Sequence, residues 1–146
     1  MSALPAIRPW PIRTRVLLAD EAGFSRTALA TALCGTPSVE LVAVMDDGRA
    51  LGEALVRLRP DVLVIDDRLL GRSRRLPFDV GARVVVIGVD DDPGYAARAR
   101  RAGAVGWVPK DRFDLLVAAI FESFDGAEKY GADPRPSADD GRSNGT

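Results

Sequence analysis

The sequence predicts an α/β fold, a doubly wound sandwich with about five parallel strands. Short apolar, β-branched segments recur five times between residues 16 and 108, and at least three of them show no polar alternation. Such continuous apolar runs are typical of parallel strands that are covered on both faces. Helical patterns separate most of these segments, and this alternation implies right-handed crossovers. The length of 146 residues, of which 47% are hydrophobic, favours a single domain with one core.

The first half of the chain predicts three strands alternating with two helices. The strands are expected at Val16–Ala19, Leu41–Val44 and Val62–Ile65. The first helix covers Phe24–Leu33 and ends near Gly35, a glycine suited to a C-cap. The second helix is closed by Pro60, just before the third strand. Its apolar face has helical spacing and consists of Leu51, Ala54, Leu55 and Leu58.

The second half is less regular. The last two strands are expected at Val84–Ile87 and Val105–Val108. Between the third and fourth strands, Gly71–Phe78 has little helical periodicity and contains Pro77, so the third helix is expected to be short or missing. Asp92 and Pro93 provide a cap and a first helical residue for the fourth helix. The last helix is expected at Asp111–Phe124, with one apolar side made of Leu115, Leu116, Ala119 and Ile120.

The two ends of the chain differ from the centre. Residues 1–13 contain three prolines and are expected to form an extended arm. The folded domain is expected to span residues 14–126. Residues 127–146 are expected to be a disordered tail or linker, because from Asp133 onward the composition is polar and rich in Pro, Ser, Asp and Gly.

Composition excludes several classes of function. The formal charge is −1, and the sequence lacks the basic excess that nucleic-acid binding requires. The chain has no histidine, which excludes Ser-His-Asp and Cys-His catalysis and histidine-ligated zinc. Cys34 is the single cysteine, expected to be a small buried hydrophobe, and it fits a reducing cytosol. No apolar run approaches the roughly 18 residues of a membrane span, so a soluble, cytoplasmic protein is expected.

Charged residues follow three of the predicted strands. Asp20 and Glu21 follow the first strand, Asp66 follows the third, and Lys110 follows the fifth. The carboxyl ends of parallel strands meet at one edge of a sheet, where ligands bind. Carboxylates are suitable ligands for Mg²⁺, and a carboxylate beside that metal can attack phosphorus while a lysine neutralises the developing charge. The edge therefore suits an aspartyl phosphate. Asp67 is interpreted as a solvated neighbour.

Three segments carry a family resemblance. In their order and spacing, Arg15–Glu21 (RVLLADE), Arg59–Asp66 (RPDVLVID) and Gly103–Lys110 (GAVGWVPK) resemble the receiver domain of two-component response regulators. The resemblance covers residues 15 to about 124. It implies a flavodoxin-like sheet with strand order 2-1-3-4-5.

The resemblance also implies roles for the site residues. Asp66 is the expected phosphoacceptor, and Lys110 is expected to contact the incoming phosphoryl group. Mg²⁺ is the expected cofactor, and its implied ligands are Asp20, Glu21, Asp66 and the backbone carbonyl of Arg68. The phosphoryl group would come from a histidine kinase or a small phosphodonor.

Several residues depart from the family pattern and make this an atypical receiver. Gly88 stands where the family has a Ser or Thr whose hydroxyl binds the phosphoryl group. Trp107 stands at the aromatic switch position, and it is interpreted either as a switch residue or as core filling. A basic cluster near the acids offers a charge that could replace a metal; it consists of Arg68, Arg72, Arg74 and Arg75. The run Asp90–Asp92 is interpreted as a solvated loop with a helix cap.

The first hypothesis for function is a signalling module. It either accepts phosphate on Asp66 or acts through a fixed surface without phosphate, and its only chemistry is gain and loss of its own aspartyl phosphate. A homodimer is expected through residues 93–124, with Arg98, Arg100 and Arg101 facing Asp111, Asp114 and Glu122. The 22 residues after Phe124 are too few for a helix-turn-helix domain, so either the chain acts alone or it precedes a DNA-binding output domain in a longer regulator of transcription.

The alternative is a degenerate flavodoxin-like scaffold with a vestigial acid pocket, or a ligand-binding domain without phosphotransfer. The loop Asp20–Ser25 contains a single glycine and neither nucleotide-binding signature, which argues against a dinucleotide or nucleotide site.

Overall fold

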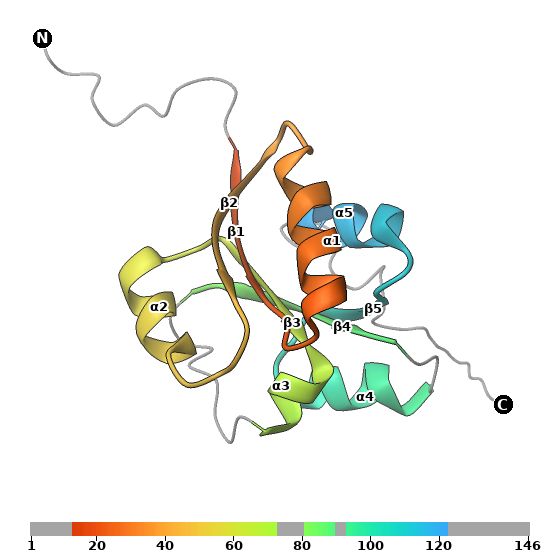
Figure 1. Ribbon diagram of the computed structural model, residues 1–146. Coiled ribbons are helices and arrows are strands. Elements are labelled where there is room, and N and C mark those ends of the chain that lie inside the picture. The colour runs from red at the N-terminus through yellow and green to blue at the C-terminus, as the bar shows by residue number, and fades with distance from the viewer. Residues whose placement is uncertain (1–12, 73–80, 90–92, 123–146) are drawn as a thin grey trace, which may run out of the picture.

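The computed structural model describes residues 13–72, 81–89 and 93–122 (Figure 1). In this part of the chain, five parallel strands form one sheet in the order β2-β1-β3-β4-β5, which confirms the predicted doubly wound topology. The strands are β1 (Thr14–Ala19), β2 (Val39–Met45), β3 (Val62–Asp66), β4 (Arg83–Gly88) and β5 (Gly106–Pro109). The helices are α1 (Gly23–Cys34), α2 (Leu51–Leu58), α3 (Asp67–Arg72), α4 (Pro93–Arg101) and α5 (Phe113–Glu122).

Helices cover both faces of the sheet. In Figure 1, α1 and α5 lie on one side of the strands, and α2, α3 and α4 lie on the other. Alternate side chains of each strand point to opposite faces, so each central strand contributes to two separate clusters of buried residues. This double burial explains why the central strands read as continuous apolar runs.

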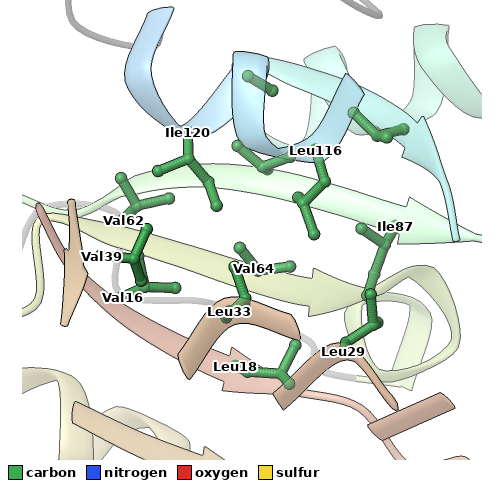
Figure 2. Close-up of a cluster of buried hydrophobic side chains, with 13 residues drawn as sticks. Val16, Leu18, Leu29, Leu33, Val39, Val62, Val64, Ile87, Leu116 and Ile120 are labelled. Atoms are coloured by element: carbon green, nitrogen blue, oxygen red, sulfur yellow. The ribbon is translucent and has the colours of Figure 1, made fainter. Parts of the chain in front are cut away.

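The cluster on the α1 and α5 side is purely apolar. Figure 2 shows valine, leucine and isoleucine side chains from the sheet packed beneath both helices. Helix α1 contributes Leu29 and Leu33, which are one turn apart, and α5 contributes Leu116 and Ile120, which are likewise one turn apart. Their spacing fixes which face of each helix turns inward, and therefore which residues of α1 lie next to the end of β1.

The opposite cluster contains the one tryptophan in the described residues. Trp107 of β5 belongs to the same buried cluster as residues of α2, α3 and α4, and 8% of its surface is exposed. The predicted apolar face of α2 is confirmed, since Leu51, Ala54 and Leu55 are buried here. Trp107 is therefore part of the core that lies beneath the ends of β4 and β5.

Some element boundaries differ from the prediction. Helix α3 begins at Asp67, directly after β3, and it is described over six residues. Helix α5 begins at Phe113 rather than Asp111, because the amide of Arg112 bonds the carbonyl of Pro109 in a turn (3.1 Å). No helix in the described ranges is both long and apolar enough to cross a membrane.

The prediction that Cys34 is buried was wrong: its side chain is exposed. Leu29 and Leu33 turn inward, and each further residue of an α-helix is rotated by about 100°. Cys34 is rotated by this angle from Leu33 and is the last residue of α1, so its side chain lies at the end of the helix, outside the buried cluster. Gly35 does cap this helix, and its amide bonds the carbonyls of Thr31 and Ala32, but its φ of −83° is one that any residue adopts.

Several predictions fall outside the described residues. These concern the arm at 1–12, the basic residues Arg74 and Arg75, the run Asp90–Asp92, and the tail at 127–146.

Candidate functional site

The ends of β1, β3 and β5 bring three charged residues together. Asp20 follows β1, Asp66 is the last residue of β3, and Lys110 follows β5. Ladder hydrogen bonds continue past the strands and fix two of these positions: the Asp20 amide bonds the Met45 carbonyl at 3.0 Å, and the Lys110 amide bonds the Gly88 carbonyl at 2.8 Å. The sheet backbone therefore sets where these side chains start.

The three side chains form a buried ionic cluster. The Lys110 Nζ atom lies 2.9 Å from Asp20 Oδ1 and 3.5 Å from Asp66 Oδ2. Asp20 is fully buried, Asp66 is 3% exposed, and the Lys110 side chain is 9% exposed. Two carboxylates share one ammonium, so this edge of the sheet keeps a negative charge in a site of low dielectric. The structure thus brings Asp20, Asp66 and Lys110 together, as the sequence predicts.

Ser25 is a fourth member of the cluster, and the sequence analysis did not single it out. Its hydroxyl donates a hydrogen bond to Asp20 Oδ2 (2.6 Å) and accepts one from Lys110 Nζ (3.1 Å). Ser25 lies in the first turn of α1, whose N-cap residue Ala22 has no side-chain cap. The only sequence signal is a hydroxyl placed one helical turn after the acidic pair.

The two buried aspartates differ in their hydrogen bonds. Asp20 accepts bonds from Ser25, Lys110 and the Ala22 amide. Asp66 Oδ1 accepts the Arg68 amide at 3.3 Å, whereas Asp66 Oδ2 is buried and accepts no hydrogen bond from the described residues. Asp66 therefore keeps one carboxylate oxygen available for a further partner.

These environments shift the two pKa values in opposite directions. Burial raises the pKa of Asp20, but the bonds from Ser25, Lys110 and the Ala22 amide outweigh it, and the net pKa lies below its usual value. Burial also raises the pKa of Asp66, and the Arg68 amide and the Lys110 charge only partly oppose it, so the net pKa lies above its usual value. Of the two aspartates, Asp20 therefore loses its proton at the lower pH.

Glu21 and Arg68 lie at the margin of the cluster. The Arg68 guanidinium is 3.8 Å from Glu21 Oε2, and its side chain is largely exposed. Arg26 of α1 bonds the backbone carbonyls of Asp20 (3.0 Å) and Glu21 (3.4 Å), which fixes the turn after β1. Asp67, predicted to be a solvated neighbour, is partly exposed at the start of α3.

A pocket of about 270 Å³ opens over the cluster. At about 30 Å³ for each water of liquid, this volume holds a phosphoryl group together with several waters. The pocket is lined by Ala22, Phe24, Ser25, Asp66, Asp67, Arg68, Gly88, Val89 and Lys110.

The donor atoms suit a magnesium ion bound by two carboxylates. Mg²⁺ takes one or two carboxylates and completes its shell with waters and phosphate oxygens. Asp20 and Asp66 are two such carboxylates, and the unsatisfied Asp66 Oδ2 is an oxygen that a cation would neutralise. In the described ranges no three or more acidic, histidine or cysteine side chains are grouped as a metal site, and Glu21 is instead close to Arg68.

Gly88, which lines the pocket, fits against the side chain of Trp107. A β-carbon added to Gly88 would lie 2.9 Å from Trp107 Nε1 and 3.2 Å from its Cζ2 atom. Real β-carbons essentially never approach other atoms as closely as 2.9 Å. The buried indole therefore occupies the space that a side chain at position 88 would need.

Comparison with known proteins identifies the family of this chain. The chain is 33% identical over 124 residues to the "Probable transcriptional regulatory protein NarL" of Mycobacterium tuberculosis, a match that covers 77% of this chain and 56% of NarL. The solved signal receiver domain of NarL from that organism has a TM-score of 0.70 and 28% identity, and the match covers 80% of this chain and 99% of that domain. The chain contains a response-regulator receiver domain.

Other relatives agree with this assignment. The receiver domain is 36% identical over 103 residues to a protein-glutamate methylesterase/protein-glutamine glutaminase of Myxococcus xanthus, covering 66% of this chain and 30% of that protein. The response regulator domain of CheB from Thermotoga maritima has the same fold, with a TM-score of 0.59 at 20% identity, over 85% of this chain and 99% of that one. No protein-family model matches the chain. The chain spans about half the length of NarL.

Proposed function

We propose that this receiver domain accepts a phosphoryl group on Asp66, from a phosphohistidine of a kinase or from a small phosphodonor, and passes the signal on through protein contacts. One observation carries the proposal. Among the described residues, Asp66 Oδ2 is a buried carboxylate oxygen that accepts no hydrogen bond, it lies 3.5 Å from a buried ammonium, and Asp66 lines an open pocket.

The residues of the site have different roles in phosphotransfer. Asp66 Oδ2 attacks phosphorus and forms a P–O bond, while the bond from phosphorus to the donor nitrogen or oxygen breaks and its electron pair leaves with the donor. Lys110 neutralises charge that develops on the phosphoryl oxygens, and the Arg68 amide holds the other oxygen of Asp66 in place. The domain's own chemistry is limited to gaining and losing this phosphoryl group.

Magnesium is the proposed cofactor. Asp20 and Asp66 would hold it, with Glu21 and the Arg68 carbonyl as the further ligands that the family resemblance implies. The ion would supply a second positive charge against the phosphoryl oxygens. Glu21 would have to leave Arg68 to contribute, which its partial exposure permits.

Incubation with Mg²⁺ and acetyl phosphate is expected to add one phosphoryl group to the protein, because the nucleophile and its counter-charge are already in place. Intact mass spectrometry measures the adduct, and treatment with base should remove it as it does other acyl phosphates. Asp66→Asn should abolish the adduct. Asp67→Asn is the matched control, because it changes the adjacent carboxylate on α3, and it should leave the adduct unchanged.

Absence of an adduct at high donor concentration would contradict this function and support the degenerate scaffold. An adduct that survives in Asp66→Asn would show a different acceptor. Loss of the adduct in Asp67→Asn would show that the two neighbouring acids are not distinguished as the geometry predicts.

Trp107 offers an optical test of metal binding. In a Trp10→Phe background, Trp107 is the remaining tryptophan, and its indole lies against Gly88, which lines the pocket. Millimolar Mg²⁺ is expected to change its emission intensity, because a cation at Asp20 and Asp66 alters the field at the indole. The change should saturate with Mg²⁺ and disappear in Asp20→Asn. A linear, unsaturated response, or the same response in Asp20→Asn, would count against a site there.

The signal partners are proposed from chemistry and from the relatives. A histidine kinase is the proposed donor. A DNA-binding output domain in a longer chain is proposed from the likeness to the transcriptional regulatory protein NarL. The receiver domain would then end near residue 126, and residues 127–146 would be the linker.

A homodimer through residues 93–124 is proposed on the exposed basic residues Arg98, Arg100 and Arg101 of α4. Asp114 already pairs with Arg112 of its own chain at 2.9 Å, so Asp111 is the better acidic partner. A cytoplasmic location is proposed with these partners.

A further inference from the structure

Ser25 connects two parts of the site that the sheet alone does not join. Its hydroxyl has a single proton, and the shorter contact, 2.6 Å to Asp20 Oδ2, is the bond it donates. A contact to the Ala22 carbonyl is longer, at 3.3 Å. A lone pair on the same oxygen accepts from Lys110 Nζ at 3.1 Å. One hydroxyl of α1 thus bridges the carboxylate after β1 and the ammonium after β5.

The bridge determines where Lys110 lies. The ammonium has hydrogen bonds to Asp20 and to Ser25, at 2.9 and 3.1 Å, and it is 3.5 Å from Asp66 Oδ2. Two of the three N–H groups of the Lys110 ammonium are therefore bonded to Asp20 and Ser25. The second carboxylate beside the ammonium is that of Asp66, whose Oδ2 atom is the oxygen proposed to attack phosphorus.

We propose that Ser25 is a positioning residue of the phosphorylation site, which holds the Lys110 ammonium on Asp20 and so keeps the Asp66 oxygen open to the phosphodonor. This inference rests on the proposed function for its consequence, the rate of phosphorylation. The position of the ammonium itself is a separate, measurable property. Ser25 acts through Lys110 and Asp20.

The position of the ammonium can be measured directly because the chain has only two lysines, Lys110 and Lys129. In a ¹⁵N-labelled Lys129→Arg background, one lysine ammonium signal remains. A buried ammonium with two hydrogen-bond partners exchanges its protons slowly with water. Ser25→Ala is expected to speed this exchange about tenfold, the effect of losing one hydrogen bond to a charged group. Ser25→Thr keeps the hydroxyl and should restore slow exchange.

The same variants test the effect on phosphorylation by acetyl phosphate. Ser25→Ala is expected to slow labelling of Asp66 about tenfold, because an ammonium held by one hydrogen bond fewer is free to shift between Asp20 and the attacking oxygen. Ser25→Thr should keep the wild-type rate. Thr27→Ala is the matched control, because it removes an exposed hydroxyl from the same helix, and it should change neither measurement. If Ser25→Ala does not fold, Ser25→Cys keeps the side-chain size and replaces the hydroxyl by a much weaker donor.

The outcomes separate this inference from the proposed function. Faster exchange in Ser25→Ala, in a protein whose wild type takes no phosphoryl group, would support the bridge and refute phosphotransfer. Unchanged exchange would refute the bridge, whatever the labelling rate. Faster exchange with an unchanged labelling rate would refute the claim that the bridge serves the acceptor.

Discussion

Lys110→Met is expected to lower the free energy of unfolding by about 3–5 kcal/mol at neutral pH, the usual cost of removing one partner from a buried ion pair. The two carboxylates that Lys110 serves are almost completely buried, at 0% exposure for Asp20 and 3% for Asp66. Methionine keeps the length of the side chain and removes its charge. The variant therefore leaves two neighbouring carboxylates without a cation, and urea denaturation monitored by circular dichroism measures the loss.

Arg112→Met is the matched control for this prediction. It also replaces a cation by methionine, only two residues away, but its ion pair with Asp114 is between side chains that are 52% and 66% exposed. Ion pairs between exposed side chains contribute little to stability, because water and salt screen the two charges. A loss in Lys110→Met no larger than that in Arg112→Met would show that the cluster is not an ionic unit.

Magnesium provides a second test of the same cluster. A ligand that binds only the folded state stabilises it by mass action. Millimolar Mg²⁺ should therefore recover more stability in Lys110→Met than in the wild type, because the variant has two carboxylates without their lysine. Equal recovery in both proteins would show that the ion binds away from Asp20 and Asp66.

The sequence predicted the fold and part of this cluster because both depend on local patterns. Continuous apolar runs identify buried parallel strands, and a charged residue directly after such a run must lie at the carboxyl edge of the sheet. Asp20, Asp66 and Lys110 each follow this rule, and each is found at that edge. No knowledge of side-chain packing was needed to place them together.

Ser25 could not be predicted in the same way. Its role depends on the rotation of α1 about its axis, which is set by Leu29 and Leu33 on the core face. The resulting contact joins residues that are 85 positions apart, Ser25 and Lys110. Cys34 was misplaced for the related reason that a helix residue is buried or exposed by its direction, and small apolar character alone does not give that direction.

Two departures from the family pattern turn out to be one feature of the packing. The sequence alone treats Gly88 and Trp107 separately, Gly88 as a lost hydroxyl and Trp107 either as a switch residue or as core filling. The register of the β4 and β5 ladder pairs Trp107 with Val86, and Gly88 lies two residues further along β4, on the same face as Val86. The glycine provides the space that the indole fills.

Gly88→Ser is accordingly expected to lower the free energy of unfolding by about 1–3 kcal/mol, the usual cost of overpacking a core. The new β-carbon would stand 2.9 Å from Trp107 Nε1, and the indole is held by a buried cluster between the sheet and helices α2, α3 and α4. Gly35→Ala is a control for glycine replacement as such. The nearest atoms there are 3.6 Å away and the φ is −83°, so we expect a change within about 0.5 kcal/mol or a slight gain.

A double-mutant cycle tests the pairing itself. Trp107→Phe alone should destabilise the domain, because it removes buried atoms from the core. In the Trp107→Phe background, however, Gly88→Ser should lower the free energy of unfolding by at least about 1 kcal/mol less than it does in the wild type. The reason is that phenylalanine lacks the indole atoms that the new β-carbon would contact. Equal costs in the two backgrounds would show that the glycine and the indole are independent. A lower cost of Gly88→Ser in the Trp107→Phe background would mean that the two positions are coupled. The domain could then regain the hydroxyl that the family has at position 88 without loss of stability only if Trp107 were replaced as well.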